Sequence, residues 1–525
     1  MAGGIAALFR LAGAGLVLAR EGAFAGIDPE AVPAGPRFAL RLARLIERRR
    51  NDAEAERLTR ALNRLGPSYV KLGQFLATRP DIVGADVAAT LGKLRDEIEP
   101  FPEVEARATI ARALGKPVET LFATFSPPVA AASIAQVHRA EVAGEGGFRA
   151  VAVKVLRPGI RPRFQRDLET FYVGARLVER LDPAARRLRP VAVVDTLARS
   201  VAIEMDLRLE AAALSEMAEA TAGDEGFRVP KVEWELTARD VLTLEWIDGI
   251  KLSDLEALRA AGHDLSELAR KLMQAFLRHA LRDGFFHADM HQGNLFIDER
   301  GDIVAVDFGI MGRLTRAERR FLAEILFGFI RRDYRRVAEV HFEAGYVPSD
   351  RHSIEDFAQA LRAIGEPIHG QRARDISMAR LLSLLFEVTE LFDMQTRPEL
   401  LLVQKTMVVV EGVARSLDPD FDMWSASEPV VRDWVERYLG PAGQLELAVE
   451  GVGALGRLVA ELPRLAERAE RLAAEMDRVG ERGIRLDPET VAQIGRSEAH
   501  ASRWGRVALW VIAAVAVVAG INLIW

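Results

Sequence analysis

The sequence of 525 residues contains no cysteine. This absence excludes disulfide bonds, thiolate catalysis and zinc or iron–sulfur centres held by cysteine, and it suits a reducing compartment. An excess of one charge is also missing, because 70 Lys and Arg residues stand against 76 Asp and Glu residues. The net charge of −6 gives no general reason to expect nucleic-acid binding. Apolar residues make up 49% of the chain, enough for most of it to bury a core.

Residues 507–525 lack charged side chains altogether. A helix rises about 1.5 Å per residue, so a run of this length is close to the hydrocarbon thickness of a bilayer. Arg496, Arg503 and Arg506 precede the run and favour a cytoplasmic location for the bulk of the chain. We predict a transmembrane helix at residues 505–525, a single-pass anchor in the inner (cytoplasmic) membrane. A buried core helix is the alternative.

The N-terminal residues 5–18 are apolar and rich in glycine and alanine, with Arg10 inside the run. They lack a clear cleavage site for a signal peptide. We expect an amphipathic helix that lies on the domain or on the membrane surface.

Internal repeats and low-complexity linkers are also absent, and the pattern of apolar residues divides the chain. Helical spacing dominates residues 38–125. Short β-rich runs at 136–142, 150–155, 229–234 and 241–246 then alternate with helical runs at 163–183 and 191–220. From Leu252 onward the helical pattern returns. The predicted fold is α+β, with these parts: a helical N-terminal extension (1–125), a small mixed lobe (126–249), a larger helical lobe (250–440), a helical linker (441–504) and the transmembrane helix (505–525).

Within the predicted linker, apolar residues of 458–479 recur at alternating spacings of four and three. This stripe is too short to establish a coiled coil. We expect a helix docked on the body or leading to the anchor, and a homodimer formed through the stripe is the alternative.

The clearest chemistry stands in His287–Asn294, followed by Asp307-Phe308-Gly309. A carboxylate, a carboxamide five residues later and a second carboxylate after the next hairpin can converge on one point. Their oxygens are ligands that Mg²⁺ accepts, and protein kinases use this order and spacing. We predict a protein-kinase-like site that binds ATP or ADP with Mg²⁺. Asn294 and Asp307 would hold the metal and Asp289 would act near the attacking oxygen; surface turns capped by Asp and Asn are the alternative.

Lys154 stands in the predicted strand 150–155, where alternation places it on the same face as Ala152. A lysine on this face can bind the α- and β-phosphates and pair with a glutamate from a helix, for which Glu210 is the candidate. Glu245, in the β-rich run 241–246, is also expected among the nucleotide-binding residues. An ordinary strand lysine and a solvated helix glutamate are the alternatives.

Glycines are missing where a protein kinase has its phosphate-covering loop, since residues 128–138 read PVAAASIAQVH. Alanine reaches positive φ less easily than glycine, so the loop should be stiffer. We expect Ala131, Ala132 and Ser133 to face the phosphates through their backbone N–H groups and the serine hydroxyl. His287 and His291 leave a zinc site as an alternative, although no second cluster completes a ligand set.

Together these motifs resemble the UbiB/ABC1/ADCK family of atypical protein-kinase-like proteins over roughly residues 40–440. The matching segments occur in the family's order and are Lys71-Leu72-Gly73-Gln74 (the KxGQ signature), Ala130-Ala131-Ala132-Ser133, Val151-Ala152-Val153-Lys154, Glu204-x-Asp206 with Glu210, His287-x-Asp289-x-His291-x-Gly293-Asn294 and Asp307-Phe308-Gly309.

The resemblance implies a protein-kinase-like bilobal core whose cleft is covered by the KxGQ helices, so that Lys71 and Gln74 approach the nucleotide with Glu204 as a partner. It also implies a role in ubiquinone biosynthesis, with membrane lipid, quinone precursors and quinone-biosynthesis enzymes as partners. Relatives look more like ATPases or small-molecule kinases than regulators of proteins. A true protein kinase is disfavoured because no Ala-Pro-Glu and no long activation loop follow Gly309. A nucleotide-sensing scaffold without turnover stays open.

Overall fold

The structure is a computed structural model that describes residues 2–24, 44–47 and 54–440, less residues 78, 84, 93, 95–98, 145–146, 182–184 and most of 370–397. The described residues fall almost entirely into one compact unit, Met1–Arg437, and Tyr438–Trp525 make up the second unit. The predicted linker, its apolar stripe and the predicted transmembrane helix lie outside the described residues. Within the described part of the chain, no helix has the length and apolar character needed to cross a membrane.

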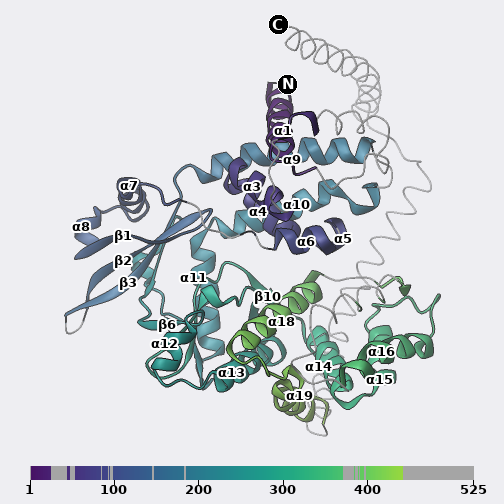
Figure 1. The fold of residues 1–525 in the computed structure, drawn as a ribbon. Helices are drawn as coiled ribbons and strands as arrows, with labels where there is room; N and C mark the ends of the chain where they lie inside the picture. The colour runs from purple at the N-terminus through teal and green to yellow at the C-terminus, as the bar shows by residue number, and fades with distance from the viewer. Residues whose placement is uncertain are drawn as a thin grey trace, which may run out of the picture. The chain divides into compact units, whose positions relative to one another are not determined.

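Seven helices of the described residues precede the first strand (Figure 1). They are α1 (Ala2–Arg20), α3 (Glu54–Leu65), α4 (Pro67–Ala77), α5 (Pro80–Val83), α6 (Ala85–Leu91), α7 (Glu103–Leu114) and α8 (Val118–Leu121). The predicted N-terminal helix is present as α1 and packs on α9 (Ile160–Leu181), where Arg10 Nε donates to Thr170 Oγ1 over 3.0 Å. Its opposite face leaves Phe9 70% exposed.

An antiparallel sheet with the strand order β1-β2-β3-β5 forms the small lobe. Its strands are β1 (Thr124–Ala131), β2 (Ala135–Gly144), β3 (Gly147–Leu156) and β5 (Val241–Glu245). In β3, Val151, Val153 and Val155 point into the core that α7 and α8 cover. Because side chains alternate along a strand, Lys154 lies on the other face.

Two expectations for this lobe differ from the structure. The helical run 191–220 is two helices, α10 (Pro190–Glu204) and α11 (Leu207–Ala220), because Asp206 caps α11 by accepting from the Arg208 N–H. The β-rich run 229–234 forms no strand; a short β4 (Phe227–Arg228) precedes it, and Val232 makes one isolated bridge to Leu244. Pro230 has no N–H for a sheet ladder, which explains the interruption.

The large lobe contains two small sheets, ordered β4-β9-β8-β6 and β10-β7. Their further strands are β6 (Gly249–Lys251), β7 (Phe285–His287), β8 (Leu295–Asp298), β9 (Ile303–Ala305) and β10 (Met311–Arg313). The helices are α12 (Leu255–Ala260), α13 (Leu265–Arg278), the π-helical η4 (His279–Asp283), α14 (Arg316–Arg331), α15 (Tyr334–Glu343), α16 (Ile354–His369), α18 (Pro398–Leu417) and α19 (Met423–Leu439). Helices α13 and α18 pack along each other (Figure 1).

Candidate functional site

The β8–β9 hairpin brings Asn294 and Asp307 to the same end of its sheet. Leu295 pairs with Ala305, and the Val306 N–H donates to the Asn294 carbonyl over 2.9 Å. The second sheet pairs His287 with Met311 and so places the segment before Asp289 beside the segment after Gly309. The three predicted residues Asp289, Asn294 and Asp307 therefore come from neighbouring loops.

The loop that carries Asp289 is held by a buried histidine. His287 is fully buried, its Nδ1 accepts from the Asp289 N–H over 3.0 Å, and its Nε2 lies 3.4 Å from the Val306 carbonyl. These partners require the neutral tautomer with the proton on Nε2. Burial favours that state, because it lowers the pKa of His287. Asn294 Nδ2 donates to the Asp289 carbonyl over 3.2 Å and fixes the other side of the loop.

Lys154 lies between two carboxylates. Its Nζ donates to both oxygens of Glu210 over 2.8 and 2.9 Å and to Asp307 Oδ1 over 3.1 Å. Burial opposes the charge on Lys154, but the Asp307 and Glu210 carboxylates outweigh it and raise the pKa of Lys154. The ammonium in turn outweighs desolvation at Asp307 and lowers the pKa of that carboxyl, whereas burial raises the pKa of Glu210. The lysine stays charged, as phosphate binding requires.

Asp307 has a left-handed backbone conformation with φ +65°. An aspartate tolerates this region better than most residues because its short side chain bonds locally, and its Oδ1 accepts from the Gly309 N–H over 3.3 Å. The turn directs the carboxylate toward Lys154 and leaves the side chain 48% exposed. An exposed, charged carboxylate beside a carboxamide is suited to a metal ion.

Asn294 and Asp307 fit a magnesium ion by the chemistry of their donors, which are hard oxygens. Across the described residues, His, Asp and Glu side chains form no group of three or more able to enclose a metal. Asn294 and Asp307 therefore suit an open magnesium site that phosphate oxygens complete. The described residues supply no ligand set for the alternative zinc site.

The alanine loop differs from expectation. Ala131 ends β1, and the Ala132 N–H donates to the Ala135 carbonyl over 2.8 Å, so the chain turns back at once into β2. Ser133 lies within this turn and is fully buried. Its predicted contact with phosphate is not available in this conformation, because the side chain has no exposed surface.

The KxGQ segment lies on α4. Lys71 Nζ is 2.6 Å from Glu204 Oε2, so the structure brings together α4 and the end of α10. Gln74, one turn further along α4, is partly buried. A Cβ at Gly73 would lie 2.4 Å from Leu94 Cδ1 and 2.9 Å from Leu62 Cδ1. The glycine thus lets α4 pack closely against its neighbours.

Glu245 belongs to a different cluster. Its carboxylate lies 3.1 Å from Arg228 Nη1 and also accepts from the Lys231 N–H over 3.1 Å. Arg228 pairs in turn with Asp298 over 2.8 Å. These contacts hold the end of β5 to β4 and β8, and they do not bring Glu245 to Lys154.

Three contacts around the site were not expected from the sequence. Thr406 of α18 donates to the Ala288 carbonyl over 3.2 Å. Arg313, which follows Gly309 on β10, pairs with Glu216 of α11 over 2.6 Å. Arg282 pairs with Asp224 just beyond α11. In each contact the two residues are far apart in the sequence and lie in segments without a distinctive motif, so no local pattern predicts the contact.

The segment after Gly309 is short. Residues 310–315 contain β10 and then Thr315, which caps α14 in a reciprocal bond with Glu318. This leaves six residues between Gly309 and the helix, as the sequence indicated.

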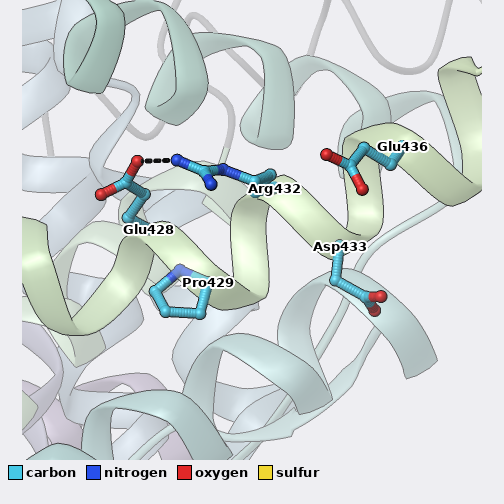
Figure 2. A pocket seen from close by; sticks show the side chains of 5 residues that line it. All are labelled: Glu428, Pro429, Arg432, Asp433 and Glu436. Carbon is cyan, nitrogen blue, oxygen red and sulfur yellow. Dashed lines mark hydrogen bonds and ion pairs between the residues drawn. The ribbon is translucent and has the colours of Figure 1, made fainter.

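Figure 2 shows a surface hollow elsewhere in the protein. It has a volume of about 320 Å³ and is lined by α19 residues of both charges: Glu428, Pro429, Arg432, Asp433 and Glu436. Arg432 forms an ion pair with Glu428 one turn away. The hollow contains none of the predicted site residues.

Two family models match consecutive parts of the chain. The ABC1 atypical kinase-like domain matches residues 93–341, and the UbiB helical domain matches residues 361–422. "Probable protein kinase UbiB" of Marinobacter nauticus is 39% identical over 422 residues, which are 79% of this chain and 76% of that protein. A solved structure, the Rv3197–erythromycin complex from Mycobacterium tuberculosis, has 25% identity and a TM-score of 0.49 over 72% of this chain and 97% of that one. With its kinase-like α+β fold, the chain belongs to the UbiB family of ABC1 atypical kinase-like proteins.

Proposed function

We propose that this protein is a membrane-anchored, Mg²⁺-dependent ATPase or kinase that supports ubiquinone biosynthesis. The observation that carries the proposal is the Lys154–Glu210–Asp307 cluster, in which a charged lysine is held by Glu210 within 3.1 Å of Asp307. A phosphate-handling site of the kinase type requires these groups. Family membership supports the link to ubiquinone biosynthesis.

Each residue of the site would have a distinct role. Lys154 would bind the phosphates of ATP, with Glu210 holding its ammonium in place. Asn294 and Asp307 would hold Mg²⁺, which when bound offsets the charge of the phosphate oxygens. Asp289 would orient the attacking hydroxyl or water and accept its proton, provided that this oxygen lies within hydrogen-bond distance. His287 would keep the Asp289 loop in place through its bond to the Asp289 N–H.

A water molecule or a small acceptor is favoured over a protein substrate. The six residues between Gly309 and α14 offer little platform for a peptide. A true protein kinase is the second candidate, because the Marinobacter relative carries that name. A nucleotide-sensing scaffold of a quinone-biosynthesis complex is a third, and it would use the same site without turnover.

Membrane anchoring is part of the proposal. The uncharged run 507–525 and the arginines before it support a single-pass anchor in the inner membrane, with the kinase-like lobes in the cytoplasm. Quinone precursors are apolar, so a site held at the membrane would meet them there. The quinone-biosynthesis enzymes are proposed partners on the same ground.

The test is ATP turnover by the full chain in phospholipid vesicles, with Mg²⁺, γ-labelled ATP and a phenolic quinone precursor. We expect phosphate release that Asp307→Asn abolishes and that Asp350→Asn, at an 80% exposed side chain, leaves unchanged. Label on the precursor would identify a kinase, and free phosphate alone an ATPase. Label on an added protein would favour the second candidate. Nucleotide binding without turnover in the unaltered chain would favour the scaffold.

A further inference from the structure

The peptide unit between Ala288 and Asp289 is held on both sides. Its carbonyl accepts from Thr406 Oγ1 over 3.2 Å, and its N–H donates to His287 Nδ1 over 3.0 Å. The preceding Ala288 N–H donates to the Ile310 carbonyl over 3.0 Å. A peptide unit is planar, so bonds at its two ends fix the direction in which the next Cα presents its side chain. That side chain is Asp289.

One of these two supports comes from outside the ABC1 kinase-like domain. Thr406 lies on α18, within the 361–422 match to the UbiB helical domain, and it is fully buried. Val403 and Val410, three residues before it and four residues after it on the same helix, are also buried. A hydroxyl in such surroundings is costly unless it is hydrogen-bonded. The hydroxyl has a single proton, which it shares between the Ala288 carbonyl and the Leu402 carbonyl one turn back, 2.8 Å away.

The threonine contact is one of three that α18 and α19 make with residues 274–288. Trp434 Nε1 of α19 donates to the Leu281 carbonyl in η4 over 2.8 Å. Gln274 Nε2 of α13 donates to the Ala426 carbonyl of α19 over 3.2 Å. Helices α18 and α19 therefore bind the continuous stretch 274–288 at three points spaced seven residues apart, and the last of these adjoins Asp289.

We propose that Thr406 is a positioning residue for Asp289. The UbiB helical region is then a structural part of the catalytic site, because α18 bonds the carbonyl of the peptide that leads into Asp289. Since the effect on turnover rests on the proposed function, the test also measures the loop itself.

The test compares Thr406→Val and Thr406→Ser in the full chain. A matched control is Thr109→Val, because Thr109 is also buried and its hydroxyl donates to the carbonyl four residues back, Glu105, over 2.9 Å in α7. The measurements are amide hydrogen exchange of residues 285–294 and steady-state phosphate release. We expect Thr406→Val to speed exchange in this segment and to lower kcat, each by about fivefold, with an unchanged KM for ATP. Thr406→Ser and Thr109→Val should resemble the unaltered protein.

Two results would overturn the proposal. One is unchanged exchange at 285–294 in Thr406→Val; the other is an equal change in Thr109→Val, which would show a general effect of losing a buried hydroxyl. If valine prevents folding, Thr406→Ala removes the hydroxyl with less steric demand and gives the same readings. Should the unaltered chain release no phosphate, the proposed function fails, while hydrogen exchange still decides whether Thr406 holds the loop.

Discussion

Two lysine–glutamate ion pairs lie along α10 and α11, and their glutamates are six residues apart in the sequence. Lys71 and Glu204 are 2.6 Å apart, with side chains 13% and 10% exposed. Lys154 and Glu210 are 2.8 Å apart, with side chains 16% and 6% exposed. The two ion pairs are therefore similar in their nitrogen–oxygen distance and in the burial of their side chains. The first pair joins the N-terminal extension to α10, whereas the second joins the sheet of the small lobe to α11.

The Lys154 pair also meets a charge from the large lobe. Lys154 faces Asp307 over 3.1 Å, so one cation is shared by two carboxylates. Removal of that cation leaves two negative charges facing each other. Distance and burial alone thus understate how strongly a site depends on one residue, and the predictions below test this difference.

The largest effect is expected for Lys154→Met. Phosphate release should fall by at least about 100-fold, because the phosphates lose their cation. Stability should fall by about 3 kcal/mol in chemical denaturation, because Glu210 is left buried and unpaired beside Asp307. Adding Glu210→Gln should restore stability but not turnover. Lys251→Met, at an exposed strand lysine, is the control, and equal losses in the two lysine variants would contradict the shared-cation interpretation.

Mild acid is expected to have the next largest effect, and it should destabilise the two lobes more than the N-terminal extension. Burial lowers the pKa of His341 from 6.5 to about 4, and burial also lowers the pKa values of three other histidines, His138, His279 and His287. Between these pH values the unfolded chain binds more protons, so stability falls as the pH falls, by about 3 kcal/mol for His341 alone. Residues 1–125 contain no histidine.

Hydrogen exchange between pH 6.5 and pH 4, corrected for intrinsic rates, checks this prediction. Protection should decrease in the two lobes before it decreases in α3 and α4. His341→Phe keeps an aromatic ring beside Phe357 and should flatten the pH dependence. Simultaneous loss of protection in the lobes and in α3 and α4 would show that these parts unfold together.

Gly73→Ala should perturb the extension with a smaller effect. Its Cβ would lie 2.4 Å from Leu94 Cδ1, so α4 must shift or Leu94 must move, at a cost of about 1–3 kcal/mol. Leu94→Ala in the same chain should recover part of the loss, because it removes the clashing atom. Thermal denaturation measures both variants. Affinity for a fluorescent ATP analogue should change less than in Lys154→Met. An equal change would show that nucleotide binding depends on the Lys71–Glu204 region as strongly as on the Lys154–Glu210 pair.

The smallest effect is expected for Glu216→Gln. Its ion pair with Arg313 is as short as the Lys71 pair, at 2.6 Å, but the side chains of Arg313 and Glu216 are 65% and 44% exposed. Exposed pairs contribute about 0–1 kcal/mol, so the melting temperature should hardly move. A loss of stability as large as that of Lys154→Met would mean that burial does not explain the difference between the Arg313–Glu216 and Lys154–Glu210 pairs.

The sequence predicts this site well where its parts are local. A hairpin of fixed register places Asn294 beside Asp307, and alternation along a strand points Lys154 away from the core. Burial of Ser133 was not predictable, because it depends on how tightly the alanine turn closes. The Thr406 contact spans 118 residues, and no motif marks that threonine within its helix. Contacts made by packing distant helices leave no periodic signal in the chain.

The six residues between Gly309 and α14 contain one hydroxyl side chain, that of Thr315. That hydroxyl donates to Glu318 and accepts from the Glu318 N–H, so it closes the first turn of the helix. Phosphorylation of Thr315 would remove the hydroxyl proton that Glu318 accepts and place a phosphate beside that carboxylate, so the reciprocal bond of the cap would be lost. The segment has no second hydroxyl at which phosphorylation could leave this cap intact.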